Sequence, residues 1–463
     1  MDNFDWSATG FRNKKDAHTM KGLTIFLYEW KHFVRSPFKI VATVLFVFAG
    51  MYGLHNGEKL YQEQMGVIAT ISEKSQEQIN KHTLFFDQEN PSPENRPWVN
   101  LSMPDWAIWY TRTYHFKTPS PAIVYSIGQA EQYGFYKRVN YMSSPYDTDM
   151  TKEIANPERL QTGTIDFAFA LIFLLPLLLI ILLYNLKSME HEQGFLPLIE
   201  VQIATKNIWL MSKVLFYFVF IYLVIVGLLF YGALLTDVFA SSGSIFGEML
   251  FYSLLYLVFW TIIFFLLIRK GSGIMENTLK MVGIWLIATF IIPAAVHQWI
   301  SIEKPANLMT DFIDASRDKK EALYDEDDSV LKARLSALFP EIENSALFMD
   351  NSRNKHAFQE SKLALLNELK KENIALIEAE NTMKNTMVQN SYPFNLISFF
   401  QNRFNKVAKT HYNDYQNYRN EIQYLVDIQL ETMVVDLWND TKVDKERFTE
   451  YHEIFSSKNL NQN

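Results

Sequence analysis

Residues 163–213 read GTIDFAFALIFLLPLLLIILLYNLKSMEHEQGFLPLIEVQIATKNIWLMSK. They begin with an unbroken apolar run, 167–183, which is long enough to cross a bilayer. A short polar segment with Glu190, Glu192 and Gly194 follows, and the next long apolar run begins after Lys213. The pattern predicts a hydrophobic hairpin in which two membrane helices are joined by a compact acidic loop.

The composition bounds what surrounds this hairpin. The chain has 463 residues, of which 49% are hydrophobic, but its mean hydropathy is only -0.06. Large water-facing parts must therefore balance the apolar runs. The formal net charge of -8 argues against nucleic acid as a partner. The absence of cysteine excludes disulfides and cysteine-ligated metals.

Five apolar runs are long enough to span a bilayer, and basic residues set their orientation. Lysine and arginine gather before the first run, between the second and third, and between the fourth and fifth. We therefore expect an α-helical polytopic protein of the inner (cytoplasmic) membrane, with a cytoplasmic N-terminus and a periplasmic C-terminal domain. It should have about five transmembrane helices and two large extracytoplasmic segments, the second mostly helical. The predicted spans are 38–54, 165–184, 214–235, 246–268 and 281–302.

The segments outside the spans have distinct patterns. Residues 1–19 should form a flexible extension, and 20–37 an amphipathic helix in the cytoplasmic interface. Residues 185–213 and 269–280 should be cytoplasmic loops. In the interface helix the candidate contact residues are Tyr28, Glu29, Trp30 and Arg35. The alternative is that this helix is only the water-exposed end of the first span.

The first extracytoplasmic segment, 55–164, should begin as a helix and then turn into extended structure that is rich in proline and aromatic residues. Trp98, Trp106, Trp109 and Tyr110 could form a sugar or lipid platform, although such residues more often make a small core. The second segment, 303–463, should contain one long helix near 358–387 and a second helical stretch from Phe394 past Trp438.

Several kinds of chemistry have no sequence support. The chain has no GxxxxGK[ST] loop for nucleotide phosphates, no HExxH zinc motif and no GxSxG nucleophile elbow. Glu190, His191 and Glu192 are metal-ligand types, but adjacent helical residues point in different directions. We therefore expect no catalytic, metal or cofactor site in this chain.

Two prolines lie inside predicted spans, Pro176 in the second and Pro293 in the fifth. Each can kink its helix and open a cavity along a translocation path. The alternative is that each kink serves packing alone.

Four motifs together resemble a known family. They are YEWKHFVRSP at 28–37, PAIVYSIGQ at 121–129, IDFAFALIFLLPLLLIILLYN at 165–185 and MEHEQGFLPLIEVQIATKNIWLMSK at 189–213. The chain resembles the permease subunits of ABC-2 type (type V) ATP-binding cassette transporters, in the branch with large extracytoplasmic insertions that is common in Bacteroidetes. It departs from the family at Ile203, where a proline is usual, and in having no sixth apolar run after Glu303.

The resemblance implies a function and partners. It implies an exporter permease coupled to a separate cytoplasmic P-loop ATPase, which would hold ATP and magnesium. Glu190, Glu192, Gln193 and Gly194 would form the coupling loop, with both carboxylates pairing with basic residues of that ATPase. A second permease copy or a related permease would complete the complex in the lipid bilayer.

Three other classes of function remain open from the sequence. The chain could be an ATP-driven mechanotransmission or scaffold subunit that acts on an extracytoplasmic partner without transporting a substrate. An ion-driven carrier would need internal repeats and midplane charges, and a membrane enzyme would need a catalytic constellation; the sequence contains neither. The sequence does not identify a substrate.

Overall fold

A computed structural model describes residues 13–88, 91–93, 96–147, 149, 164–198, 206–241, 243–271, 273–304, 317–350 and 353–456. Five helices in these ranges are long and apolar enough to cross a membrane, which confirms the helical membrane class. The first span is the start of α2 (Pro37–Phe85), the third is α10 (Lys206–Leu235) and the fourth is α12 (Gly243–Lys270). The second span consists of α6 (Phe167–Phe169), η2 (Ala170–Leu174), α7 (Leu175–Leu183) and α8 (Ser188–Glu192). The fifth consists of α13 (Ile274–Leu286), η3 (Ile287–Ile291) and α14 (Ile292–Glu303).

The remaining elements lie mainly in two groups, one before the second span and one after the fifth. Those before the third span are α1 (Asn13–Val34), α3 (Pro104–Tyr110), β1 (Tyr114–Phe116), η1 (Pro121–Val124) and β2 (Tyr136–Arg138). The later ones are α11 (Val238–Ser241), α16 (Asp328–Leu338), η4 (Pro340–Asn344), α17 (Ala346–Met349), α18 (Lys355–Asn390), α19 (Leu396–Val407), α20 (Tyr412–Trp438) and α21 (Lys445–Ile454). The strands β1 and β2 pair antiparallel.

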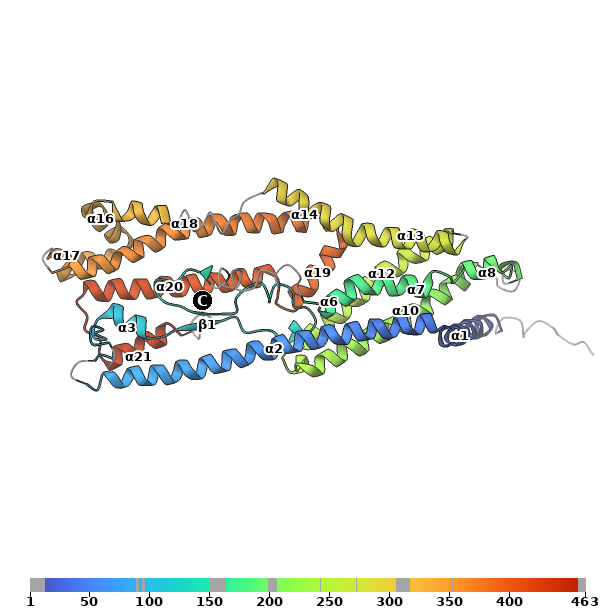
Figure 1. The fold of residues 1–463 in the computed structure, drawn as a ribbon, viewed down its shortest axis with the longest axis horizontal. Coiled ribbons are helices and arrows are strands. Elements are labelled where there is room, and N and C mark those ends of the chain that lie inside the picture. The colour runs from blue at the N-terminus through green and yellow to red at the C-terminus, as the bar shows by residue number, and fades with distance from the viewer. Residues whose placement is uncertain are drawn as a thin grey trace, which may run out of the picture.

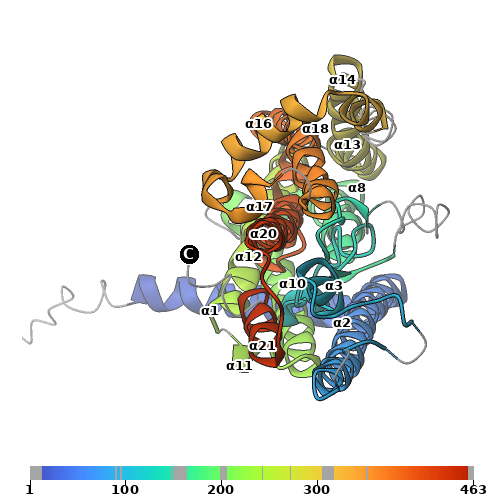
Figure 2. The same cartoon turned by 90° about the vertical axis from the view of Figure 1, so that its left-hand side faces the viewer.

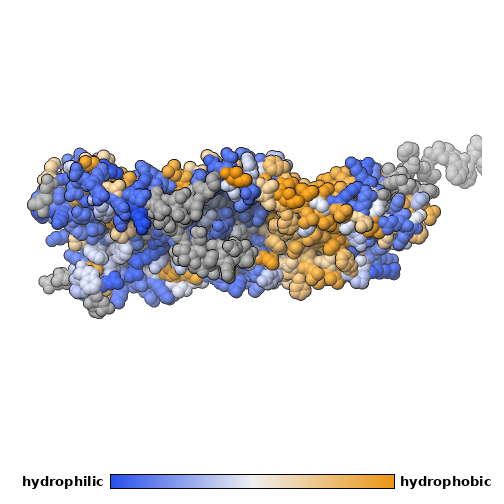
Figure 3. All heavy atoms as spheres, turned by 45° about the horizontal axis from the view of Figure 1, so that its top comes forward, coloured by the Kyte–Doolittle hydropathy of each residue, from blue (hydrophilic) through white to orange (hydrophobic). Residues whose placement is uncertain are grey.

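The elements sort into two halves along an elongated molecule (Figure 1). One half, here the spanning half, holds α1, the start of α2, α7, α10, α12 and α13, and its surface is largely apolar (Figure 3). The other, here the distal body, holds the end of α2 with α3, α16, α18, α20 and α21, and its surface is mostly polar.

Helix α2 belongs to both halves. It runs for 49 residues without interruption, or about 73 Å at the usual rise. The predicted span 38–54 covers only its first third, and the helix that was expected to follow is the same helix. No proline occurs between Pro37 and Pro91 to stop it. The spanning half and the distal body are therefore connected by one continuous rod.

Two glycines let α2 approach its neighbours closely. A Cβ atom at Gly53 would lie 2.4 Å from the backbone carbon of Asp166, and one at Gly57 would lie 2.6 Å from Val124. These separations are shorter than any van der Waals contact, so a side chain at either position would push the neighbouring backbone away. The Gly-x-x-x-Gly spacing is the one that allows membrane helices to pack tightly.

Asp166 fixes the entry to the second span. Its carboxylate accepts hydrogen bonds from the backbone N–H of Phe169 (2.7 Å), as a helix N-cap, and of Ile127 (2.9 Å). The same side chain therefore begins a membrane helix and holds the η1 loop against it.

The buried apolar residues form one large cluster in each half. The cluster of the spanning half joins α2, α7, α10 and α12 and also includes Phe400 and Phe404 of α19. The cluster of the distal body joins α3, α16, α18, α20 and α21. Because α19 lies on α12, with the rings of Tyr256 and Phe400 4.8 Å apart, the C-terminal part of the chain packs directly on the spanning helices.

The aromatic residues of the first polar segment mainly build core. Tyr110 is buried, and Trp106 and Trp109 pack on the distal cluster, whereas Trp98 is 69% exposed. The predicted helical stretch from Phe394 past Trp438 is two helices, because the chain turns at Lys409 (φ 56°) and His411 then caps α20.

Helix α1 lies across the bundle, since it is seen end-on in Figure 1 and side-on in Figure 2. Phe33 and Glu29 are buried against the bundle, whereas Tyr28, Trp30 and Arg35 are exposed. Leu27 and Val34 are also exposed on this helix. An exposed row of apolar side chains on a crosswise helix fits a helix at a membrane surface.

Candidate functional site

The loop after the second span is short and sharply turned. Helix α8 ends at Glu192, and Gly194 then adopts a φ of +75°, a conformation that glycine adopts without strain. Backbone hydrogen bonds run from Gly194 N–H to His191 O (3.1 Å) and from Phe195 N–H to Glu190 O (2.9 Å). The chain therefore turns sharply at Gly194. Residues 199–205, which include Ile203, lie outside the described residues, as do 1–12 of the N-terminal extension.

Glu190 forms an ion pair with Lys213 of this chain. Its Oε1 accepts from Lys213 Nζ at 2.5 Å, and the same ammonium lies 3.1 Å from Glu29 Oε1. Lys213 also donates to the carbonyl of Leu186 and lies over the ring of Trp209. One buried lysine at the start of α10 therefore connects the loop to α1. We call Lys213, Glu29 and Glu190 the lysine cluster.

A second buried lysine lies next to this cluster. Lys39, near the start of α2, donates to the carbonyl of Leu182 (2.9 Å) and to the hydroxyl of Tyr217 (3.0 Å). Leu182 is near the end of α7 and Tyr217 is on α10. The first turn of α2 is thus connected to the end of α7 and to Tyr217, about three turns into α10.

Glu192 and Lys187 bind the ends of α13 and α12. Glu192 Oε1 accepts from the backbone N–H of Ile274 at 2.9 Å, at the N-terminus of α13, where a carboxylate is favoured. Lys187 Nζ donates to the carbonyls of Arg269 and Gly271, both at 2.9 Å, at the C-terminal end of α12. Ser188 accepts a hydrogen bond from Asn277 of α13.

These contacts change the expected role of the two glutamates. Both carboxylates were expected to pair with a partner protein, but each has an oxygen bound to a group of this chain. Gln193 and Gly194 remain exposed at the tip of the loop. The exposed large apolar residues beside them are Phe195 and Leu198, at 53% and 63%.

A cavity of about 580 Å³ lies beside the loop. Its charged lining residues are all basic in type: Lys187, His191, Arg269 and Lys270. No carboxylate is among the lining residues that the structure describes. The surface next to the loop tip is therefore suited to an acidic or apolar element rather than a basic one.

The two predicted kinks share one construction. Pro176 and Pro293 each stand at the start of an α-helix that directly follows a five-residue π-helical turn, η2 and η3. A proline has no N–H to donate to the carbonyl four residues before it. At the first kink that carbonyl belongs to Ile172, and the Tyr256 hydroxyl of α12 donates to it at 2.6 Å. The cross-helix hydrogen bond satisfies the carbonyl that the proline leaves open.

Comparisons with known proteins add no relative: no family model, curated protein or solved structure matches the chain. The described residues also contain no group of three or more histidine or acidic side chains that could hold a metal ion.

The sequence contains patterns that could have drawn attention to Lys39, Lys213 and the glycines of α2, but these patterns do not identify the contacts that the residues make. A lysine at the first turn of an apolar run favours a buried cation that binds carbonyls or carboxylates from neighbouring helix ends. The spacing of Gly53 and Gly57 favours close helix packing. Neither pattern indicates which segment is the partner, and two of the partners, Leu182 for Lys39 and Asp166 for Gly53, lie more than 100 residues further along the chain.

Proposed function

We propose that this chain is the permease subunit of an ATP-binding cassette exporter, driven by a separate cytoplasmic ATPase. The observation that carries the proposal is the loop at 187–194, which is bonded to the ends of α10, α12 and α13 and, through Lys213, to α1. A partner that displaces this loop moves several membrane helices together. ATP and magnesium would be bound by the partner.

The contacts suggest how such a displacement would be divided. Glu190 acts through Lys213 on α10 and on the crosswise helix α1. Glu192 and Lys187 act on α13 and α12. In this proposal the glutamates transmit the motion inside the chain, and the exposed Phe195 and Leu198 with the basic cavity form the surface that the ATPase contacts.

The charges support one orientation. The basic residues around 187, 213 and 269–270 lie at the loop end of the spanning half, and such a bias supports a cytoplasmic position for that end. The distal body would then be periplasmic and would receive or shield the substrate there.

The test is purification of the complex from native membranes, followed by ATP turnover measurements on loop variants. We expect a P-loop ATPase to co-purify in near-equal amount. Glu192→Ala should lower ATP turnover by several-fold while membrane insertion is unchanged, because α13 loses its contact with the loop. The control is Glu276→Ala, which removes a carboxylate in the first turn of α13 that forms an ion pair with Lys280 of the same helix. Recovery without an ATPase, or equal turnover in both variants, would contradict the proposal.

A second candidate, mechanotransmission to a periplasmic partner, is favoured by one observation. The rod α2 continues about 30 residues beyond its predicted span, and its glycine contacts join it to the start of the second span. Such a rod can carry a displacement of the spanning helices out to the distal body.

Spin labels can separate the two candidates, and the cysteine-free chain makes selective labelling direct. An exporter should change the distance between labels at 234 and 302, at the ends of α10 and α14, when ATP binds to the complex. A mechanotransmitter should keep that distance and change the one between 74, on the distal part of α2, and 302. Double electron–electron resonance measures both.

A further inference from the structure

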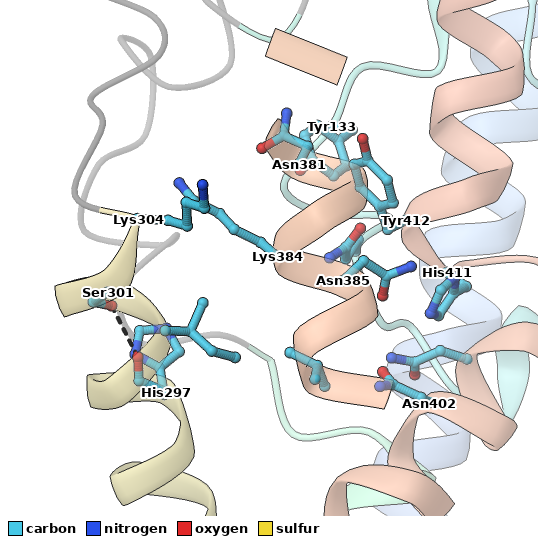
Figure 4. A pocket seen from close by; sticks show the side chains of 14 residues that line it. Tyr133, His297, Ser301, Lys304, Asn381, Lys384, Asn385, Asn402, His411 and Tyr412 are labelled. Atoms are coloured by element: carbon cyan, nitrogen blue, oxygen red, sulfur yellow. Dashed lines mark hydrogen bonds between the residues drawn. The ribbon is translucent and has the colours of Figure 1, made fainter. Parts of the chain in front are cut away.

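A cavity of about 480 Å³ lies where the spanning half meets the distal body. One wall is the last turns of α14, with His297, Ser301 and Lys304, and the opposite wall is α18, α19 and the start of α20 (Figure 4). Because α14 ends the fifth apolar helix, the cavity opens at the depth where a bilayer surface would lie.

The chemistry of the lining is cationic and rich in amides. Lys304 and Lys384 reach toward each other from α14 and α18, and Asn381 and Asn385 stand beside them (Figure 4). The lining residues that the structure describes include no aspartate or glutamate. Among the described residues neither ammonium lies within 4 Å of a carboxylate, so these two half-buried cations have no counter-ion in that part of the chain.

A second, independent observation concerns Gln129, which lines the cavity from the loop after η1. Its side-chain oxygen is buried and has no hydrogen-bond partner in the structure. A buried acceptor without a donor is costly. A ligand that brings a hydroxyl group would satisfy it, while two lysines and two amides suit the oxygens of a phosphate.

The approach to the cavity is apolar on the lipid side. Trp299 and Ile302 of α14 are exposed, at 50% and 69%, on the helix that forms one wall. Ile300 and Val388 contribute apolar surface to the lining itself. A molecule with a polar head and an apolar tail could therefore place its head in the cavity and keep its tail against α14.

We propose that this cavity binds a phosphate-bearing polyol, a chemistry found in the headgroup of an anionic glycerophospholipid and in a soluble sugar or glycerol phosphate. The lysines bind the phosphate, and the Gln129 oxygen accepts from a hydroxyl. The inference does not depend on the proposed transport function, because it needs neither ATP nor a partner protein.

The test uses the full chain in detergent with lipid added, read by native mass spectrometry. Phosphatidylglycerol and phosphatidylcholine with the same acyl chains are compared, and glycerol 3-phosphate is titrated by calorimetry. The variant is Lys304→Gln with Lys384→Gln. The matched control, Lys59→Gln with Lys74→Gln, removes the same charge from the exposed surface of α2. Lys304→Arg with Lys384→Arg keeps the charge and should keep binding.

We expect phosphatidylglycerol to bind preferentially and the glutamine variant to lose about tenfold or more in affinity, with the control unchanged. Glycerol 3-phosphate binding that is lost in the same variant would assign the site to a soluble ligand of the same chemistry. Binding that is equal in the wild-type chain and the folded glutamine variant, or absent for both probes, would overturn the inference and leave a solvent-filled cavity.

Discussion

Lys213 in the spanning half and Arg419 in the distal body both lie between two carboxylates, but their surroundings differ. Arg419 binds Glu378 at 2.8 Å and Asp149 at 3.5 Å, and the hydroxyls of Tyr146 and Tyr412 donate to the two oxygens of Glu378, each at 2.6 Å. In the lysine cluster, the second oxygen of Glu190 is buried and has no hydrogen-bond partner among the residues that the structure describes.

The difference separates a fixed junction from an adjustable one. The arginine network uses a rigid guanidinium, and both oxygens of Glu378 are satisfied by groups from separate parts of the chain. In the lysine cluster, the flexible ammonium of Lys213 joins Glu29 of α1 and Glu190 of α8 to α10. One oxygen of Glu190 accepts no hydrogen bond from the described residues. A fully satisfied buried network makes its region rigid, and the lysine cluster has less of this constraint.

The largest expected effect is in the arginine network. Arg419→Leu would leave Glu378 and Asp149 buried without a cation, which costs about 3–5 kcal/mol of stability. Thermal unfolding of the purified chain in detergent measures it. Lys213→Met, the equivalent change in the spanning half, should cost less because that cluster can rearrange. Equal losses for the two variants would remove the distinction between them.

The next effect is at the junction of the two halves. Gly53→Val should destabilise the chain by about 1–3 kcal/mol, because its Cβ atom cannot fit against the backbone of Asp166. Gly66→Val, in the same helix, is the control, since no heavy atom lies within 4 Å of the position of its Cβ atom. Thermal unfolding of both variants measures the difference. If they are equally stable, α2 is not held by its close approach to the second span.

The sequence predicted the fold class better than the connections between segments. Long apolar runs indicate membrane helices because length and hydropathy are local properties. The continuity of α2 through residue 85 was partly visible, since a helix was expected on both sides of residue 54. The two parts form one rod because no residue between them breaks the helix. The change from apolar to polar composition at that point suggested a boundary instead.

The sequence named residues of the loop, but neither Lys213 nor the contacts that join the loop to other helices. Gly194 was assigned to the loop, and it turns the chain there through a local backbone angle. Glu29 and Glu190 were each assigned an external role, to a membrane surface and to a partner protein. The structure pairs both with Lys213, a three-dimensional contact that no sequence spacing encodes.

A smaller effect tests the kink in the second span. Tyr256→Phe removes the donor to the carbonyl of Ile172 and should cost about 1 kcal/mol. In a Pro176→Ala background the restored N–H can bond that carbonyl, so the same substitution should cost less. A double-mutant cycle from thermal unfolding measures this coupling. Additive losses would show that the tyrosine and the proline act independently and that the kink only fills space.

The smallest effect concerns His411, which lies between the two halves and caps α20. Burial lowers the pKa of His411 below its usual value near 6.5, so the folded chain holds it neutral while the unfolded chain binds a proton. Stability from this residue is therefore present above about pH 6.5 and decreases as the pH falls toward the lower folded pKa, by at most about 1.4 kcal/mol per pH unit. Protonation would also remove the Nδ1 acceptor for the N–H of Asn413. His411→Asn keeps a cap but cannot titrate, so its unfolding temperature should change less between pH 7.5 and pH 5.5. If the unfolding temperature of the variant changed with pH as much as that of the wild-type chain, the pH sensitivity would arise elsewhere in the chain. Protonation of His411 would then not affect the junction between the two halves.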